Sequence, residues 1–304
     1  MLHFLTRRAG HSAVSLMCLI VLVFFLARLT GNPADLYLEV DATAEMRAEF
    51  MRLHGLDQPV WEQFGAYFYD LVRLDLGRSI SVDRPVLSMI GQALPTTLTL
   101  AFFAMSLALT LAIVIGSFAA FRTDGLFDRV ATILSFASAS IPSFWLAMVA
   151  ILFFAVQLRL LPTSGGGGVA HWIMPVVVLA VRPTGLLVQL VRVSMTSALT
   201  ANYVQTAKAR GIADTPIIFV HALRNALLPV VTVAGDEAAG MINGAIMIEL
   251  VFNLPGMGSM LIQAIKTRDF ALIQGTVMVT ALAIFVLNLM VDLIYVALDP
   301  RIRH

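Results

Sequence analysis

Long apolar stretches separated by polar segments dominate the sequence. A helix that crosses a membrane needs about 20 apolar residues to cover roughly 30 Å of hydrocarbon, and six stretches meet this requirement. The pattern therefore predicts an all-α integral membrane protein with six transmembrane helices. The expected spans cover approximately residues 13–29, 95–121, 130–158, 172–193, 230–252 and 275–298.

A long polar segment follows the first apolar stretch. Residues 30–95 contain ten acidic and five basic residues and two pieces of helical pattern. Thr43 is expected to cap a helix that ends near His54, and Pro59 begins a second helix that runs to about Leu74. We expect the apolar face of the second helix to pack on the spans, with a ligand site as the alternative. That face contains Trp61, Phe64, Phe68 and Leu71.

A polar, basic segment lies between the fourth and fifth spans, with the sequence NYVQTAKARGIADTPIIFVHALRNALLP over residues 202–229. Asn202 is expected to cap a helix whose third residue is Gln205, and Gly211 to end it in the left-handed conformation. This helix is about 8 residues and about 12 Å long, which is too short to be stable unless it packs on something. We expect a face of small residues to allow another protein to come close. That face contains Ala201, Val204, Ala207 and Gly211, while Lys208 and Arg210 face water.

A second helix is expected in the same segment. Thr215 can cap it with Pro216 at the first position, where a missing N–H costs nothing. Pro229 is expected to mark the point where this helix meets the fifth span.

Charged residues inside the predicted spans are candidates for function. Arg182 lies near the centre of the fourth span, where an arginine costs roughly 2.5–3.5 kcal/mol. Asp236 and Glu237 of the fifth span are possible partners, because an unpaired buried charge is costly. A structural ion pair and a substrate-facing site are both open interpretations.

The third span contains several serines and a proline. Ser138 and Ser140 allow close approach of helices, and Pro142 frees a backbone carbonyl. Close helix packing and a bend that lines a pathway are equally open interpretations. The candidate translocation residues are Ser138, Ser140, Pro142, Arg182, Asp236, Glu237, Asn243 and Glu249.

Composition narrows the class of protein. Hydrophobic residues make up 59% of the 304 residues and charged residues only 13%, which excludes an ordinary soluble domain. A net charge of +1 gives no reason to expect nucleic-acid binding. The single cysteine, Cys18, excludes a disulfide framework, and the six histidines lack ligand spacing, so we expect no metal site.

The distribution of Lys and Arg predicts the orientation. The termini, the 121–129 loop and the 192–225 region together contain ten basic residues, and the opposite side contains three when the long 30–95 segment and the adjoining Arg28 are set aside. We therefore expect both termini and the 202–229 segment in the cytoplasm, and an extracytoplasmic helical insertion after the first span.

Five separated stretches resemble one family. YVQTAKARG followed by HALRNALLP resembles the cytoplasmic EAA loop of membrane subunits of bacterial ABC importers, in the version found in dipeptide and oligopeptide permeases. HGLDQP with RLDLGRSI, IPSFWLA with LPTSG, IELVFNLPGMG and DPRIR resemble the same family at matching places. Ser197, Gln205 and Thr206 depart from the EAA motif, and Arg182 and the Asp236-Glu237 pair depart from the family pattern, which Glu249 fits.

The resemblance implies a role and partners. The loop would form a coupling helix that contacts an ATPase subunit, and residues 203–211 would transmit its motion. The implied partners are a second related permease subunit, two ATPase subunits and an extracytoplasmic solute-binding protein, with di- or oligopeptides, nickel, glutathione or opine-like compounds as substrate classes. The implied coupling residues are Tyr203, Ala207, Lys208, Arg210, Gly211, His221, Arg224 and Asn225.

No phosphate-binding G-x-x-x-x-G-K-S/T sequence occurs in the chain, so we expect no enzyme activity and no bound cofactor. ATP and Mg would be bound by the partner subunits. The alternative is an ion-coupled secondary transporter or a channel. The expected organisation is a membrane anchor with an extracytoplasmic helical region over residues 1–95, and an importer transmembrane domain over residues 96–304 with its coupling loop at 197–229.

Overall fold

The computed structural model describes residues 2–29, 31–39, 41–165, 167–213 and 216–298. These residues form helices and loops, with one isolated β-bridge between Arg78 and Pro85. The chain divides into two compact units, of which the first comprises residues 1–96 and 255–283 and the second residues 97–254 and 284–304. Residues 255–283 thus join the N-terminal segment.

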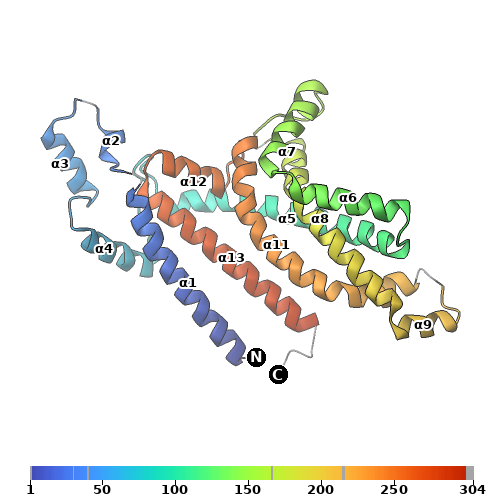
Figure 1. Cartoon of the computed structure of the whole chain (residues 1–304). Helices are drawn as coiled ribbons and strands as arrows, with labels where there is room; N and C mark the ends of the chain where they lie inside the picture. Colours follow the sequence, from blue (N-terminus) through green and yellow to red (C-terminus); the bar gives the residue numbers. More distant parts are fainter. Residues whose placement is uncertain (1, 30, 40, 166, 214–215, 299–304) are drawn as a thin grey trace. The chain divides into compact units, whose positions relative to one another are not determined.

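The first unit contains the N-terminal helices and one later segment, residues 255–283. Its helices are α1 (Leu2–Leu29), α2 (Ala34–Tyr37), α3 (Ala44–Leu53), α4 (Val60–Val72), the first part of α5 (Val86–Phe121), α12 (Met257–Lys266) and the first part of α13 (Phe270–Leu298). α1 and the beginning of α13 run side by side (Figure 1), and Val23, Ala27, Phe270 and Ile273 share one apolar core.

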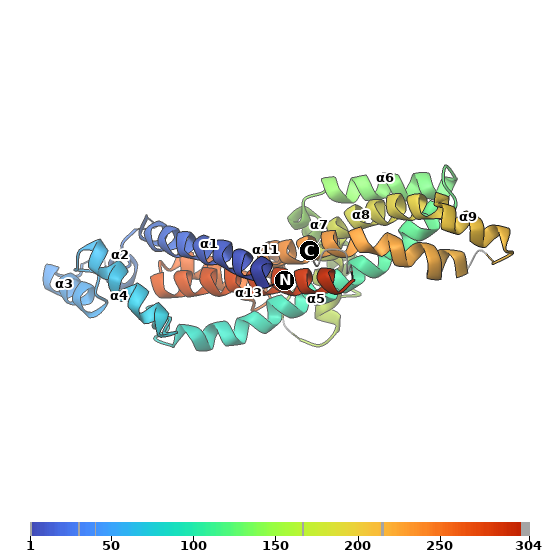
Figure 2. The same cartoon turned by 90° about the horizontal axis from the view of Figure 1, so that it is seen from below.

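The second unit contains the remaining helices. They are the rest of α5 and α13, α6 (Leu126–Ser140), α7 (Ser143–Ala150), the π-helix η1 (Ile151–Gln157), α8 (Ala170–Thr200), α9 (Asn202–Ala209), the π-helix η2 (Ile217–Ala222) and α11 (Leu223–Phe252). α6 and α11 both pack along α8, and α9 follows the end of α8 (Figure 2).

Helix length and composition test the expected spans. Within the described residues, three helices are long and apolar enough to cross a membrane, or up to five if each of two bent helix pairs is one span. The apolar part of α1, Val14–Leu29, is shorter than the length used for that test. The described chain is therefore a helical protein with several helices that are long and apolar enough to cross a membrane.

The helices α3 and α4 form as the sequence predicts. The Thr43 side chain accepts a hydrogen bond from the Met46 N–H at 3.2 Å, which caps α3. α4 begins directly after Pro59, and its aromatic face packs on α1: the ring centroids of Phe64 and Phe24 are 5.0 Å apart in an edge-to-face arrangement. This face thus packs on α1, as the first of the two interpretations predicted.

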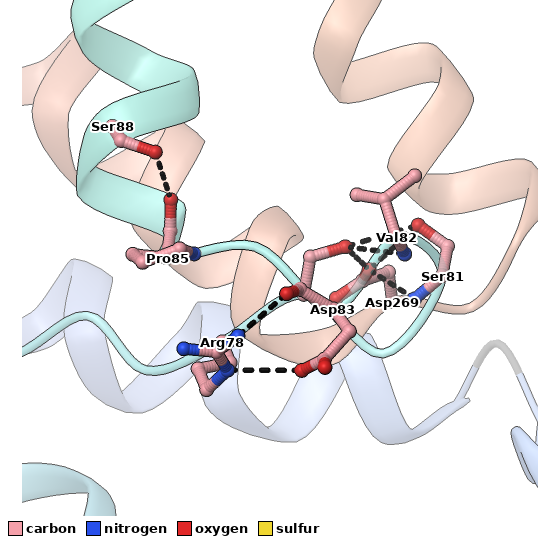
Figure 3. Close-up of polar contacts among 8 residues, drawn as sticks. Arg78, Ser81, Val82, Asp83, Pro85, Ser88 and Asp269 are labelled. Atoms are coloured by element: carbon pink, nitrogen blue, oxygen red, sulfur yellow. Dashed lines mark hydrogen bonds and ion pairs between the residues drawn. The ribbon is translucent and has the colours of Figure 1, made fainter.

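A buried carboxylate ties a loop to the start of α13. Asp269 is fully buried, and one carboxylate oxygen accepts hydrogen bonds from the hydroxyls of Ser79 and Ser81 and from the Ser81 N–H at 3.1 Å (Figure 3). The other oxygen accepts from the Leu272 N–H at 3.1 Å and so caps α13. We define Ser79, Ser81 and Asp269 as the serine–aspartate clasp.

Nearby contacts join the residues that follow α1 to the turn before α13. The Tyr37 hydroxyl donates to the Thr267 carbonyl at 2.8 Å, and the Arg268 guanidinium donates to the Asn32 carbonyl at 3.0 Å. Asp35 forms ion pairs with Arg47 at 2.8 Å and Arg268 at 3.6 Å. The polar insertion after α1 is thereby fastened to residues more than 200 positions later in the chain.

Small residues let the helices of the second unit approach closely. A Cβ added at Gly185 of α8 would lie 1.9 Å from the Ser138 hydroxyl and 2.5 Å from the Ser135 carbonyl oxygen of α6. At Gly116 of α5 it would lie 2.7 Å from the Val191 side chain of α8. Both glycines are therefore required by packing rather than by backbone conformation.

Two expected helix boundaries differ from the structure. The third span is not one helix over 130–158, because the chain bends by 103° between α6 and α7 at Ile141 and Pro142. Conversely, Pro229 does not separate two helices: α11 continues through it from Leu223 to Phe252. A proline removes one backbone hydrogen bond of a helix; α11 continues through Pro229, whereas α6 ends at Ser140 before Pro142.

Candidate functional site

The short helix α9 ends as the sequence predicts. Gly211 has φ of +78°, and the Ile212 N–H donates to the Ala207 carbonyl at 3.2 Å, which is the bond that closes a Schellman motif. The start is displaced by one residue from the prediction: Ala201 is the extended residue before the helix, and its carbonyl accepts from Val204 and Gln205. Asn202 is the first helical residue instead, and the Gln205 amide donates to the Thr200 carbonyl at 3.3 Å.

The small-residue face of α9 packs on the chain itself. Val204 is fully buried and Ala207 is 9% exposed, and both contact Ile217 of η2 in a small cluster that Leu199 of α8 completes. We define these four residues as the α9 cluster. The prediction that Val204 and Ala207 face another protein is therefore wrong, because a helix this short gains its stability by burying its apolar face in its own loop.

The opposite face of α9 is the accessible one. Tyr203 is 42% exposed and Ile212 is 38% exposed, and Thr206 and Arg210 are exposed beside them. An aromatic side chain flanked by polar ones is typical of a protein-binding surface. We define Tyr203, Thr206, Arg210 and Ile212 as the α9 outer face.

The other predicted coupling residues lie around this helix. Among the described residues, no atom lies within 4 Å of a Cβ added at Gly211, and its φ of +78° is the conformation that favours glycine. Arg224 and Asn225 are exposed near the start of α11. The side chains of Lys208 and His221 lie outside the described residues.

An ion pair that the sequence did not reveal joins α6 to α8. The Asp128 carboxylate, almost completely buried, accepts hydrogen bonds from Nε and Nη2 of Arg192, the latter at 2.8 Å, and from the Asp124 N–H at 2.9 Å. Two parallel hydrogen bonds between a guanidinium and a carboxylate fix the relative orientation of the two side chains and also strengthen the ion pair. Because the partners are 64 residues apart, neither charge stood out from its neighbours in the sequence.

The charged pathway candidates do not pair. Arg182 on α8 and Asp236 on α11 are exposed and Glu237 is half-buried, and no ion pair joins them in the part of the chain that the structure describes. The interpretation as an ion pair within this chain is therefore wrong. The faces of α8 and α11 that meet consist of apolar and small residues, which leaves Arg182 and Asp236 on outer faces.

The remaining pathway candidates have different environments. Glu249 is fully buried and accepts a hydrogen bond from the Thr97 hydroxyl. Ser138 donates to the Ser135 carbonyl at 2.8 Å and contacts Gly185, as close packing requires. Ser140 is exposed and donates to the Phe136 carbonyl at 3.0 Å, next to the bend at Pro142.

Asn243 belongs to an exposed stripe of α11. Asp236, Gly240, Asn243 and Met247 recur every three or four residues and are all exposed. This stripe contrasts with the buried face of the same helix, which contains Ala239, Ile242, Ala245 and Ile248. Asp236 and Asn243 therefore share an accessible surface, and Glu249 does not belong to it.

Two family models together match most of the chain. Residues 112–304 match the model described as "Binding-protein-dependent transport system inner membrane component", and residues 1–101 match "Binding-prot-dependent transport system membrane comp, N-term". The chain is 34% identical to the dipeptide transport system permease protein DppB of Escherichia coli, over all of this chain and 99% of that protein. It is 38% identical to a Sinorhizobium fredii protein described as a probable peptide ABC transporter permease, over 96% and 97% of the two chains.

A solved structure shares the fold. The crystal structure of an amino acid ABC transporter with histidines aligns with a TM-score of 0.53 and 15% identity, over 71% of this chain and 95% of that chain. The likeness supports the helical arrangement of the described chain.

Proposed function

We propose that this chain, which belongs to the family of inner-membrane components of binding-protein-dependent transport systems, is the permease subunit of an ATP-driven importer of di- or oligopeptides. The single observation behind this assignment is the match over the full length of a dipeptide permease. The alternative of an ion-coupled transporter or a channel is not favoured by these relatives.

The proposal includes a topology and an assembly. Six spans would cross the bacterial inner membrane with both termini in the cytoplasm, α1 acting as one span and α6 with α7 and η1 as another. The chain would pair with a second permease subunit, two ATPase subunits that bind ATP and Mg, and an extracytoplasmic solute-binding protein. The excess of basic residues in the segments expected in the cytoplasm supports this orientation.

Coupling would act through the α9 outer face. Tyr203 and Arg210 would contact an ATPase subunit, and the α9 cluster would transmit the displacement to the two helices that flank the loop. Ile217 is continuous with α11 and Leu199 belongs to α8, so a push on α9 acts on both at once. The Asp128–Arg192 pair would carry the displacement of α8 to α6.

Substitution of Gly211 tests the coupling role. Gly211→Glu places a bulky residue at a φ of +78° and a negative charge beside α9, so we expect loss of the ATPase subunits that co-purify with the wild-type chain. Gly211→Asn is the matched control, because asparagine tolerates the left-handed conformation, and it should retain them. Normal co-purification with Gly211→Glu, in correctly inserted protein, would refute the role of this loop.

Substitution of Arg182 and Asp236 gives a second test of the proposal, which concerns the translocation pathway. Arg182→Leu and Asp236→Leu should reduce peptide uptake into proteoliposomes while ATPase co-purification stays normal, because we place these charges on the pathway and not in the coupling loop. Uptake equal to that of the wild-type complex would remove both residues from the pathway.

A further inference from the structure

A polar cavity of about 270 Å³ lies within the first unit. Its walls come from the end of α1, from α4, from the loop before α5 and from the start of α13. Among the lining residues, those with polar side chains that matter here are Arg28, Gln63, Tyr67, Asp70, Asp75 and Gln274. Neither the α9 outer face nor the pathway candidates contribute to it.

Arg28 brings an unneutralised positive charge to this cavity. Its Nε and Nη2 donate to the Gln63 amide oxygen at 3.1 and 2.7 Å, and Nη1 donates to the Phe24 carbonyl at 3.1 Å. A guanidinium carries five N–H groups, so two are left for a ligand. No carboxylate forms an ion pair with Arg28 in the described parts of the chain.

Gln274 brings an unsatisfied donor. Its side chain is in α13, only 5% of the residue is exposed, and its amide nitrogen is buried without a hydrogen-bond partner among the described residues. A buried polar group without a partner is rare because it loses its hydrogen bonds to water and gains none in return. A carboxylate in the cavity would accept from Gln274 and Arg28 together.

Asp70 brings the opposite charge. It is exposed at the cavity wall and forms no ion pair in the described residues, whereas the Asp75 carboxylate accepts from the Gly77 N–H at 2.9 Å. Tyr67 of α4 adds a phenol, and burial raises its pKa above the ordinary value, so the hydroxyl stays protonated and can donate. The cavity thus offers hydrogen-bond donors and the positive charge of Arg28 together with the carboxylates of Asp70 and Asp75, of which Asp70 accepts no hydrogen bond among the described residues. The other lining arginine, Arg78, pairs with Asp83 at 2.9 Å.

We infer that this cavity binds a small zwitterion, whose carboxylate is held by Arg28 and Gln274 and whose ammonium group is held by Asp70. The volume lies below the usual range for drug-sized ligands, which fits an amino acid or a dipeptide with free termini and not a longer peptide. The inference rests on the proposed function and deepens it, since it adds a solute site on the extracytoplasmic side of the permease.

Binding of three related probes to the full chain tests the inference. The chain is placed in nanodiscs of phosphatidylglycerol, a lipid without an ammonium group, and binding is followed by saturation-transfer NMR without nucleotide. Glycylglycine carries both charges, N-acetylglycine only the carboxylate and glycinamide only the ammonium. We expect glycylglycine to bind and each single-charge probe to bind roughly tenfold or more weakly, as loss of a charge-assisted hydrogen bond implies.

Single substitutions show which side chains bind glycylglycine. Arg28→Gln should weaken glycylglycine binding roughly tenfold to a hundredfold. Asp70→Asn should weaken it about tenfold and, at an exposed position, leaves the fold intact. Arg73→Gln is the matched control, because Arg73 stacks on Tyr69 at 4.0 Å outside the cavity and should leave binding unchanged.

Several results of this experiment would overturn the inference. Equal binding of glycylglycine to the wild-type chain and to Asp70→Asn would overturn it, as would binding of N-acetylglycine as tight as that of glycylglycine. A cavity that takes a lipid headgroup would be revealed by phosphatidylethanolamine displacing glycylglycine, and that result would also overturn it. Failure of binding in a chain that still co-purifies its ATPase subunits and supports peptide uptake refutes this site and leaves the proposed function standing.

Discussion

The serine–aspartate clasp and the α9 cluster hold their segments by opposite means. The clasp buries one carboxylate, and Ser79, Ser81 and the start of α13 all donate to it. The α9 cluster has no buried charge and consists of a few apolar side chains, with Ala207 as the smallest. Loss of one partner from a buried polar network leaves the others unsatisfied, whereas a small apolar contact can loosen gradually.

This difference fits what each segment is proposed to do. A loop that must receive a displacement from another subunit needs marginal local stability, because elements that move are drawn from the least stable parts of a structure. A segment that anchors the polar insertion to a membrane helix needs a single defined position. The two regions therefore show how one chain can combine a rigid attachment with an adaptable one.

Removal of the buried carboxylate should have the largest effect. Asp269→Ala removes the carboxylate that accepts from two serine hydroxyls and two N–H groups, and we expect a loss of about 3 kcal/mol in the free energy of unfolding. The thermal unfolding of detergent-solubilised protein measures it. The control is Asp83→Asn in the same loop (Figure 3): Asp83 pairs with Arg78 at 2.9 Å at an exposed site, and asparagine tolerates its φ of +47°, so loss of the ion pair should cost less than about 0.5 kcal/mol. If both variants lost the same free energy of unfolding, the clasp would stabilise the fold no more than a surface ion pair does.

Truncation in the α9 cluster should have a smaller and more local effect. Ile217→Ala removes the fully buried side chain between Val204 and Ala207, and we expect a local loss of about 2 kcal/mol. Amide hydrogen exchange should accelerate in α9 and remain unchanged in α13. Ile212→Ala on the α9 outer face is the control and should leave exchange in α9 unchanged. Global unfolding of Ile217→Ala would contradict the adaptable character of this loop.

A steric change at Gly185 should have the smallest effect. The added methyl of Gly185→Ala meets Ser138 and Ser135, and we expect destabilisation by about 1–2 kcal/mol. Gly240→Ala on α11 is the matched control, since no atom of the described residues lies within 4 Å of a Cβ added there and alanine favours a helix, so stability should stay equal or rise by up to about 1 kcal/mol. If both variants behave alike, Ser138 does not act as a packing residue.

Local patterns in the sequence determined much of this fold. The apolar stretches located the long helices, Thr43 located the cap of α3 and Gly211 located the end of α9. These features depend on residues within a few positions of one another. Proline disfavours a helix because it lacks an N–H and restricts the residue before it; the chain bends near Pro142, whereas Pro229 leaves α11 intact, so the residue type alone did not decide the outcome.

Only the tertiary structure decided which partners meet. The Asp269 carboxylate binds serines 188 and 190 residues away, and Asp128 pairs with an arginine 64 residues away, so no local pattern marks these contacts. The same reason explains the two errors in the candidate site. Arg182 forms no ion pair within the described ranges, and Ala207 packs on Ile217, because the choice of neighbours depends on how whole helices pack and not on the residue types alone.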